Sequence, residues 1–168
     1  RLTSGVIVAC KDHLSHRHLS LAFQAGRVEK IYWALVAGHL RDNVGEIDAA
    51  IGYAPQSARM STDPTATSAK AAVTRFRVIE RFDEPYSLVE AKPLTGRLHQ
   101  IRVHLAGIGH PIVADDFYGT SPDVELIDRQ ALHAEEIAFA HPITGEAVVI
   151  AAPLPADFQG AIDGLRAN

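Results

Sequence analysis

The sequence predicts an α+β domain whose core is a mixed, largely antiparallel sheet flanked by helices. Stretches typical of strands outnumber stretches with helical spacing, and the two kinds do not alternate strictly along the chain. No internal repeat, low-complexity tract or linker rich in Pro and Gly divides the sequence. Its 168 residues, 47% of them hydrophobic, suffice for one compact core. We therefore expect a single domain over residues 1–168.

Composition narrows the possible environments and partners. Charged residues make up 21% of the sequence and no apolar run approaches the ~20 residues of a membrane-spanning helix, so we expect no membrane span. The first residues lack a secretion signal and Cys10 is the single cysteine, which together favour the cytoplasm. A net charge of -4 argues against broad, non-specific binding to the phosphate backbone of nucleic acid. Six Lys and Arg residues between positions 75 and 102 still allow a local basic face.

The first elements follow from local signals. Residues 5–10, "GVIVAC", form a β-branched run that predicts a buried strand. Asp12 then offers an N-cap for a helix, which Gly26 is suited to stop. One stripe of this helix carries Leu14, His18, Leu21 and Ala25. Residues 28–37 alternate well enough to predict the next strand, which carries Tyr32.

The middle of the chain mixes strands with a long loop. Residues 45–52, "GEIDAAIG", predict a further strand, whereas Ser, Thr, Pro and Asp between residues 55 and 68 predict an irregular, exposed loop. Residues 71–81 and 86–92 predict an antiparallel pair, because the "DEP" turn between them ends in a Pro that cannot continue a ladder.

Helical spacing returns after "PLTG". The apolar face of this helix is formed by Leu98, Ile101, Leu105 and Ile108. We expect it to end at Gly107 or Gly109. Residues 131–155 then predict two strands joined by a turn at 143–145, and residues 155–165 predict a closing amphipathic helix.

The densest group of polar side chains stands where the helix after "PLTG" begins. Arg97, His99, Gln100 and Arg102 follow a Gly turn, and a helix start adds free N–H groups and the positive end of the helix dipole. Such a group suits a phosphate or a carboxylate. A single member of it, such as Arg102, can equally be a solvated helix residue.

Other chemistries fit the sequence less well. Five side chains are of types that bind zinc or iron: His99, His104, His110, Asp115 and Asp116. Two of these histidines are five positions apart, about 140° around a helix, whereas a two-histidine helical site uses a four-residue offset. We therefore expect no metal. Ser4 lacks a Gly-x-Ser-x-Gly elbow and no phosphate-binding loop is present, so neither a hydrolase triad nor a nucleotide cofactor is indicated.

Residues 94–119, "LTGRLHQIRVHLAGIGHPIVADDFYG", resemble the signature of the RluA-type pseudouridine synthases, which isomerise selected uridines in ribosomal or transfer RNA. The stretch "EKIYWALVAGHL" resembles the Lys-x-Tyr-x-Ala-x-Val-x-Gly strand of this family, and "AKAAVTRFRVIERF" its next strand. The stretches "RQALHAEEIAFAHPITGE" and "APLP" resemble its C-terminal hairpin. The motifs stand in the family's order along nearly the whole chain. Leu98 departs from the small polar or basic residue that the family more often has.

The same resemblance draws attention to the first residues. The family motif reads His-Arg-Leu-Asp-x-x-Thr-Ser-Gly, whereas Leu2 is followed here directly by Thr3-Ser4-Gly5. Three residues are absent, and one of them is the catalytic Asp. Because "GVIVACKD" continues the family pattern, we expect a short loop with this Asp between Leu2 and Thr3 in the polypeptide, rather than a true deletion. We also expect the polypeptide to extend before Arg1.

The resemblance implies an isomerisation that needs no cofactor. The uridine is flipped out of its RNA context, its N-glycosidic bond is broken, and the rotated base is rejoined through C5. The Asp acts at the sugar and must stay ionised in an enclosed pocket. Arg97 is implied as its bidentate partner, and Tyr32 as a ring that stacks on the base or takes part in proton transfer.

The remaining implied roles concern the substrate. Ile101 matches an aliphatic wall of the uracil pocket, while His99, Gln100 and Arg102 bind RNA or fix the helix start. Ribosomal or transfer RNA is the expected partner, and the protein is expected to be a monomer. Two alternatives stay open. One is a catalytically inactive RNA-binding relative, and the other is a metallohydrolase with ligands His99, His110 and Asp115.

Overall fold

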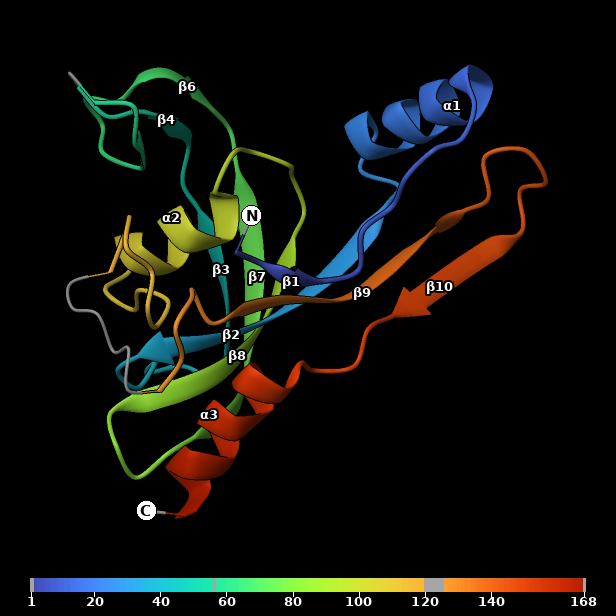
Figure 1. Ribbon diagram of the computed structural model, residues 1–168. Helices are drawn as coiled ribbons and strands as arrows, with labels where there is room; N and C mark the ends of the chain where they lie inside the picture. Colours follow the sequence, from blue (N-terminus) through green and yellow to red (C-terminus); the bar gives the residue numbers. More distant parts are fainter. Residues whose placement is uncertain (1, 56, 120–125, 168) are drawn as a thin grey trace.

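The computed structural model describes residues 2–55, 57–119 and 126–167 (Figure 1). The strands in this part of the chain are β1 (Ser4–Gly5), β2 (Glu29–Ala37), β3 (Val44–Asp48), β4 (Ile51–Tyr53), β5 (Met60–Ser61), β6 (Thr67–Lys70), β7 (Val73–Arg81), β8 (Tyr86–Pro93), β9 (Leu132–Ala140) and β10 (Ala147–Ala151). The helices are α1 (His13–Gln24), α2 (Gln100–Gly107) and α3 (Ala156–Ala167).

One seven-stranded sheet forms the centre of the described molecule, in the order β1-β9-β2-β8-β7-β3 with β10 also paired to β9. Neighbouring strands are antiparallel except for β1 and β9, which are parallel. A second, small sheet has the order β5-β4-β6. The predicted fold class, α+β with a mixed and largely antiparallel sheet flanked by helices, is thus confirmed.

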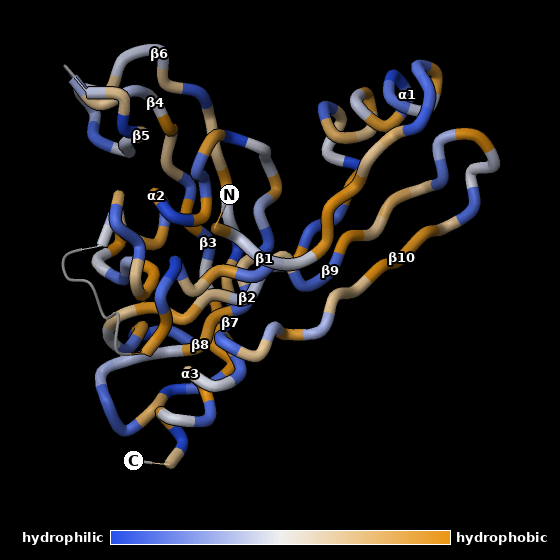
Figure 2. The backbone as a smooth tube through the Cα atoms, viewed as in Figure 1, coloured by the Kyte–Doolittle hydropathy of each residue, from blue (hydrophilic) through white to orange (hydrophobic). Residues whose placement is uncertain are grey.

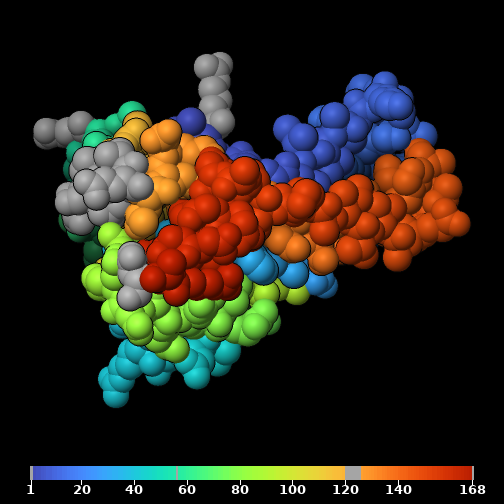
Figure 3. Space-filling model, turned by 60° about the horizontal axis from the view of Figure 1, so that its bottom comes forward, coloured from blue at the N-terminus to red at the C-terminus, as the bar shows by residue number. Residues whose placement is uncertain are grey.

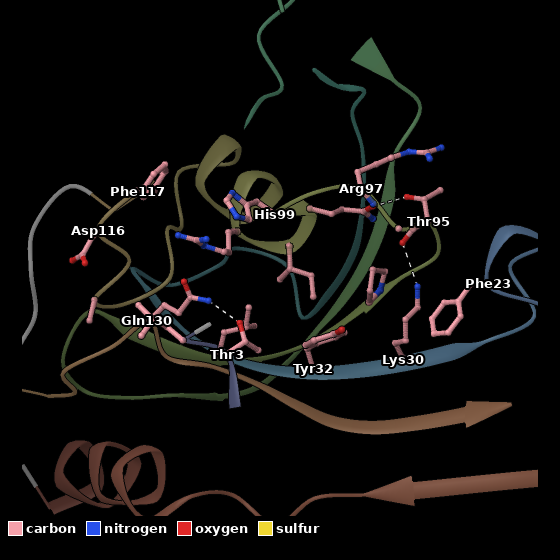
Figure 4. Close-up of a pocket in the computed structure, with 18 residues that line it drawn as sticks. Thr3, Phe23, Lys30, Tyr32, Thr95, Arg97, His99, Asp116, Phe117 and Gln130 are labelled. Atoms are coloured by element: carbon pink, nitrogen blue, oxygen red, sulfur yellow. Dashed lines mark hydrogen bonds between the residues drawn. The ribbon is translucent and has the colours of Figure 1, made fainter. Parts of the chain in front are cut away.

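Helices α2 and α3 lie on opposite sides of the central sheet (Figures 1 and 4). Ile101 and Leu105, four positions apart on α2, are buried in the same core as Phe158 and Ile162, four positions apart on α3. Both helices are therefore held by one apolar face each. Among the described residues, no helix is both long enough and apolar enough to span a membrane.

Helix α1 and the outer half of the β9–β10 hairpin project together from the main body (Figures 1 and 3). Leu19 of α1, Val28 and Ile137 form a separate small apolar cluster there. The Nδ1 atom of His18 lies 2.7 Å from the backbone oxygen of Pro142, which links α1 to the hairpin turn. In Figure 2, β10 is coloured as a predominantly hydrophobic strand.

Most predicted elements are confirmed, but the strand predicted over residues 5–10 is wrong. Pairing with β9 stops after Gly5, although the backbone N–H of Val6 still donates to the oxygen of Ala134 at 2.9 Å. From Glu136 onward β10 pairs with β9, while β2 occupies the opposite edge. Residues 6–10 therefore have no free strand edge beside them, and their alternating apolar side chains pack without a ladder.

Further predictions need correction. Of the apolar face predicted for α2, Ile101 and Leu105 are buried, but Leu98 and Ile108 lie outside the helix and are 58% and 40% exposed. Helix α1 begins at its predicted cap, but it buries Leu19, while Leu14 and Leu21 are 52% and 47% exposed. Spacing identifies the stripes of a helix, whereas the neighbouring elements decide which stripe is covered. Part of the loop predicted between residues 55 and 68 is in fact β5 and the start of β6. A two-residue strand such as β5 is too short to leave a periodic signal.

Candidate active site

A cavity of about 660 Å³ opens where β2, the turn after β8 and the first described residues meet (Figure 4). Its volume lies in the usual range of small-ligand sites, about 300–1,000 Å³. The lining includes all the residues predicted for catalysis and substrate binding: Tyr32, Arg97, His99, Gln100, Ile101 and Arg102. The structure therefore brings the predicted site residues together, from β2, the turn after β8 and α2.

Strand β2 forms the floor of the cavity. Lys30 and Tyr32 are two residues apart and therefore share a strand face, and both point into the cavity (Figure 4). Burial raises the pKa of Tyr32, so its phenol keeps its proton at neutral pH. Its hydroxyl has no hydrogen bond to another described residue, which leaves it available to a ligand. Ile101, only 6% exposed, adds an apolar wall.

The junction between Leu2 and Thr3 also lies at this cavity, because both residues line it. The hydroxyl of Thr3 accepts a hydrogen bond of 2.7 Å from the amide of Gln130. Gly5 pairs with Ala134 of β9 at a φ of 110°, and a Cβ atom at Gly5 would overlap the Ala134 backbone. The Thr-Ser-Gly turn is thereby fixed against the sheet beside the cavity.

Gln100 holds the turn that precedes α2. Its Oε1 atom accepts from the hydroxyl of Thr95 at 2.7 Å and from the backbone N–H of Arg97 at 3.0 Å. Its Nε2 atom donates to the backbone oxygen of Val73 and to the hydroxyl of Thr74. The amide thus uses both donors and both acceptor positions within the protein. Of the two roles left open for Gln100, this geometry favours fixing the helix start.

The Arg97 side chain turns away from the cavity that the residue helps to line. Its Nε atom donates to the backbone oxygen of Ala71 at 2.9 Å, and Figure 4 shows the side chain extending away from Tyr32. Within residues 2–55, 57–119 and 126–167 no carboxylate forms an ion pair with it. The pairing of Arg97 with a catalytic carboxylate stays a prediction.

Arg102 is bound within the protein by a bidentate ion pair. Its Nε and Nη2 atoms donate to the two carboxylate oxygens of Asp115 at 2.7 and 2.6 Å. Asp115 also accepts from the backbone N–H groups of Phe117 and Tyr118. Burial alone would raise the pKa of Asp115, but the hydrogen bonds and the charge of Arg102 hold it below its usual value. Arg102 therefore anchors the segment after α2 instead of being a solvated helix residue.

His99 occupies the N-terminal edge of α2 in a left-handed conformation, with φ 55°. Its Nδ1 atom lies 2.9 Å from the hydroxyl of Tyr118, and its ring meets those of Phe117 and Tyr118 edge to face. Burial, followed by the charge of Arg102, lowers the pKa of His99. A neutral imidazole with one nitrogen directed at Tyr118 can still offer its other nitrogen to a ligand.

The comparisons with known proteins agree with this arrangement. The model of the RNA pseudouridylate synthase family matches residues 1–107. The chain belongs to this family. Membership confirms the resemblance to RluA-type pseudouridine synthases. It also explains why the predicted motifs converge on one cavity.

Curated members of the family are similar along nearly the whole chain. The uncharacterized RNA pseudouridine synthase YhcT of Bacillus subtilis is 41% identical over 94% of this chain and 51% of its own length. Ribosomal large subunit pseudouridine synthase C of Vibrio cholerae is 38% identical over 99% of this chain and 53% of its own length. The chain thus spans about half the length of the curated relatives it matches.

Solved structures of the family share the fold. The human RNA Pseudouridylate Synthase Domain Containing 1 superposes with a TM-score of 0.78 at 29% identity, over 94% of this chain and 74% of that one. The human RNA Pseudouridylate Synthase Domain Containing 4 superposes with a TM-score of 0.72 at 24% identity, over 92% of this chain and 69% of that one. The second likeness concerns the fold alone.

Lys30 and Gln130 also line the cavity, although neither was assigned a role from the sequence. Lys30 could have been, because it is the Lys of the Lys-x-Tyr motif and shares a strand face with Tyr32. Gln130 could not, because its contact with Thr3 joins two separate motifs whose residues are 127 positions apart. Only the parallel pairing of β1 with β9 brings these two together.

Proposed function

We propose that this protein is an RNA pseudouridine synthase that isomerises specific uridines to pseudouridine. The bond between C1′ and N1 is broken, C1′ is joined to C5, and the hydrogen on C5 leaves to solvent while N1 regains a proton. The composition of the nucleoside does not change, so no oxidant, reductant or cofactor is required. Family membership supports this reaction, and so does a cavity of suitable volume with a phenol on its floor.

The observation that carries the proposal is the position of the Leu2–Thr3 junction. In the family motif the catalytic Asp precedes Thr-Ser-Gly by three positions, so a loop inserted at this junction would start and end at the cavity lining. Tyr32 lies on the floor of the same cavity (Figure 4). A carboxylate in that loop would face the sugar of a nucleoside that is stacked on the Tyr32 ring.

Arg97 is the proposed partner of this carboxylate. An Asp enclosed by the cavity would have a raised pKa from desolvation, and a guanidinium opposes this with a permanent charge and two hydrogen bonds. Arg97 donates a single N–H to the backbone oxygen of Ala71. Because this site is partly exposed, water can replace Arg97 as the donor. Rotation about the side-chain torsions of Arg97 would redirect its guanidinium into the cavity that the residue already lines.

The RNA class and the setting of the reaction are also proposals. Ribosomal or transfer RNA is the proposed substrate. The similarity to ribosomal large subunit pseudouridine synthase C of Vibrio cholerae supports ribosomal RNA. We propose a monomer in the cytoplasm, because one chain supplies every described wall of the cavity and carries a single cysteine. Light scattering on the purified protein checks the oligomeric state.

The test is tritium release from RNA labelled at C5 of uridine, with enzyme that carries the Asp-bearing loop. Tyr32→Phe keeps the ring but removes the hydroxyl, and should lower turnover by about 10²-fold or more while RNA affinity changes little. Arg97→Ala should lower turnover by about 10²–10³-fold. Tyr53→Phe, on an exposed tyrosine of β4, and Arg75→Ala, on an exposed arginine of β7, are the matched controls.

Full turnover of Arg97→Ala would reject its role as the carboxylate's partner. Full turnover of Tyr32→Phe would limit Tyr32 to stacking. If no uridine of cellular RNA loses isomerisation when the gene is removed, the proposed function itself is wrong.

A further inference from the structure

Lys30 is a cation on the cavity floor to which the proposed reaction assigns no role. Strand β2 places it beside Tyr32, with Phe23 and Thr95 around its side chain (Figure 4). It is partly buried, in a part of the cavity distant from Asp116 (Figure 4). Lys30 and the exposed carboxylate of Asp116 therefore mark opposite ends of the cavity, with Tyr32 between them.

The ammonium group of Lys30 is poorly satisfied by the protein. Its Nζ atom is 3.4 Å from the backbone oxygen of Thr95 and 5.9 Å from the centre of the Phe23 ring. An ammonium group has three donors, and these two contacts are long. In the part of the chain that the structure describes, no carboxylate forms an ion pair with Lys30.

Lys92, on the adjacent strand β8, differs from Lys30 because it has a carboxylate partner. The ammonium of Lys92 lies 2.6 Å from the carboxylate of Glu29, so its charge is balanced within the protein. Burial lowers the pKa of Lys30, because it removes water from the ammonium group. A partly buried cation without a counter-charge, in a cavity, is suited to receive an anion from a ligand.

We propose that Lys30 binds a backbone phosphate of the RNA, next to the nucleoside that is held over Tyr32. This inference rests on the proposed function for its ligand. Residues two apart on a strand are about 7 Å apart. The path from a nucleobase across its ribose to the adjoining phosphate is of the same order. The proposal also orients the ligand, because a phosphate at the other end of the cavity would meet the carboxylate of Asp116.

The test is the salt dependence of RNA binding, measured by fluorescence anisotropy with a short labelled single-stranded oligouridylate and the chain as it stands. Each phosphate contact with single-stranded RNA adds about 0.7 to the slope of log affinity against log salt concentration. Lys30→Gln should therefore reduce the slope by about 0.7, whereas Lys30→Arg should retain it. Lys92→Gln removes the same charge outside the cavity and should also retain the slope. Circular dichroism verifies that each variant is folded.

Three outcomes would overturn the proposal. One is an unchanged slope in Lys30→Gln, and another is an equal loss of slope in Lys92→Gln, which would indicate a general effect of charge. The third is observed with the protein that carries the Asp-bearing loop: a loss of turnover in Lys30→Gln at saturating RNA with unchanged binding would make Lys30 a proton-transfer group. Binding needs no turnover, so a protein that carries the Asp-bearing loop and binds through Lys30 but isomerises nothing would contradict the proposed function and leave this inference intact.

Discussion

Arg102 and Arg97 stand five residues apart at the start of α2, and their surroundings differ sharply. The side chains of Arg102 and its partner Asp115 are 13% and 0% exposed and share a bidentate ion pair. The guanidinium of Arg97 holds one backbone oxygen and, within the described residues, no carboxylate. The difference separates a cation that builds the wall of the cavity from one that is available to a ligand or a catalytic acid.

Residue type alone could not have made this distinction. Both arginines belong to the same motif, in which Arg97 was expected to pair with a catalytic carboxylate and Arg102 to bind RNA or fix the helix start. Burial of a charge is costly unless a counter-charge and hydrogen bonds compensate for it, and Asp115 supplies both to Arg102. Among the described residues Lys30 has no carboxylate partner, and it resembles Arg97 in this respect.

The largest expected difference between the two arginines is in stability, and substitution of Asp115 tests it. Asp115→Ala leaves Arg102 buried without a partner and releases the backbone N–H groups that Asp115 holds, so the free energy of unfolding should fall by about 3–5 kcal/mol. Arg97→Ala should change it by no more than about 0.5 kcal/mol. Urea unfolding followed by circular dichroism measures both. Similar losses of stability in the two variants would contradict the view that Arg102 is structural and Arg97 is not.

A smaller effect concerns His104, a buried ionisable group with no ion-pair partner among the described residues. Its Nε2 and Nδ1 atoms lie 3.0 Å from the backbone oxygen of Ala49 and 2.9 Å from the hydroxyl of Thr74. Because that oxygen only accepts, Nε2 carries the proton and Nδ1 accepts from Thr74. Burial lowers the pKa of His104, although the hydrogen bond to Ala49 and the charge of Asp48 act in the opposite direction.

The sign of the pH dependence follows from this shift. The folded pKa of His104 lies below the unfolded value of about 6.5, so below about pH 6.5 the unfolded chain binds a proton that the folded chain does not. Stability should therefore be highest above that pH and fall as the medium becomes more acidic. His99 acts in the same direction. Urea titrations across this range should show a flatter profile for His104→Asn than for the unchanged protein.

The sequence predicted those parts of the fold that depend on local signals. Asp12 caps α1, Pro85 ends the turn between β7 and β8, and α2 ends at Gly107. The strand expected over residues 5–10 failed, because its apolar pattern does not reveal that β10 pairs with β9 from Glu136 onward. Pairing depends on which segment reaches a strand edge, and this is a property of the whole fold.

In the candidate site, too, local motifs were predicted correctly, whereas contacts between distant segments were not. Tyr32 and Ile101 were placed from motifs and do line one cavity. The confinement of Gln100 to internal hydrogen bonds and the support of Thr3 by Gln130 come from contacts between distant segments. The direction of the Arg97 side chain could not be read from its motif either, because a long side chain follows its available partners.

The central claim is that a carboxylate at the Leu2–Thr3 junction, beside Tyr32 and within reach of Arg97, completes a pseudouridine synthase site. The direct measurement is tritium release from C5-labelled RNA by three proteins: the chain as it stands, the chain with Asp-Ala-Ala inserted between Leu2 and Thr3, and the chain with Asn-Ala-Ala inserted there. We expect release only from the protein with the Asp insertion. Equal release from the Asp and Asn insertions, or full release from the uninterrupted chain, would contradict the claim.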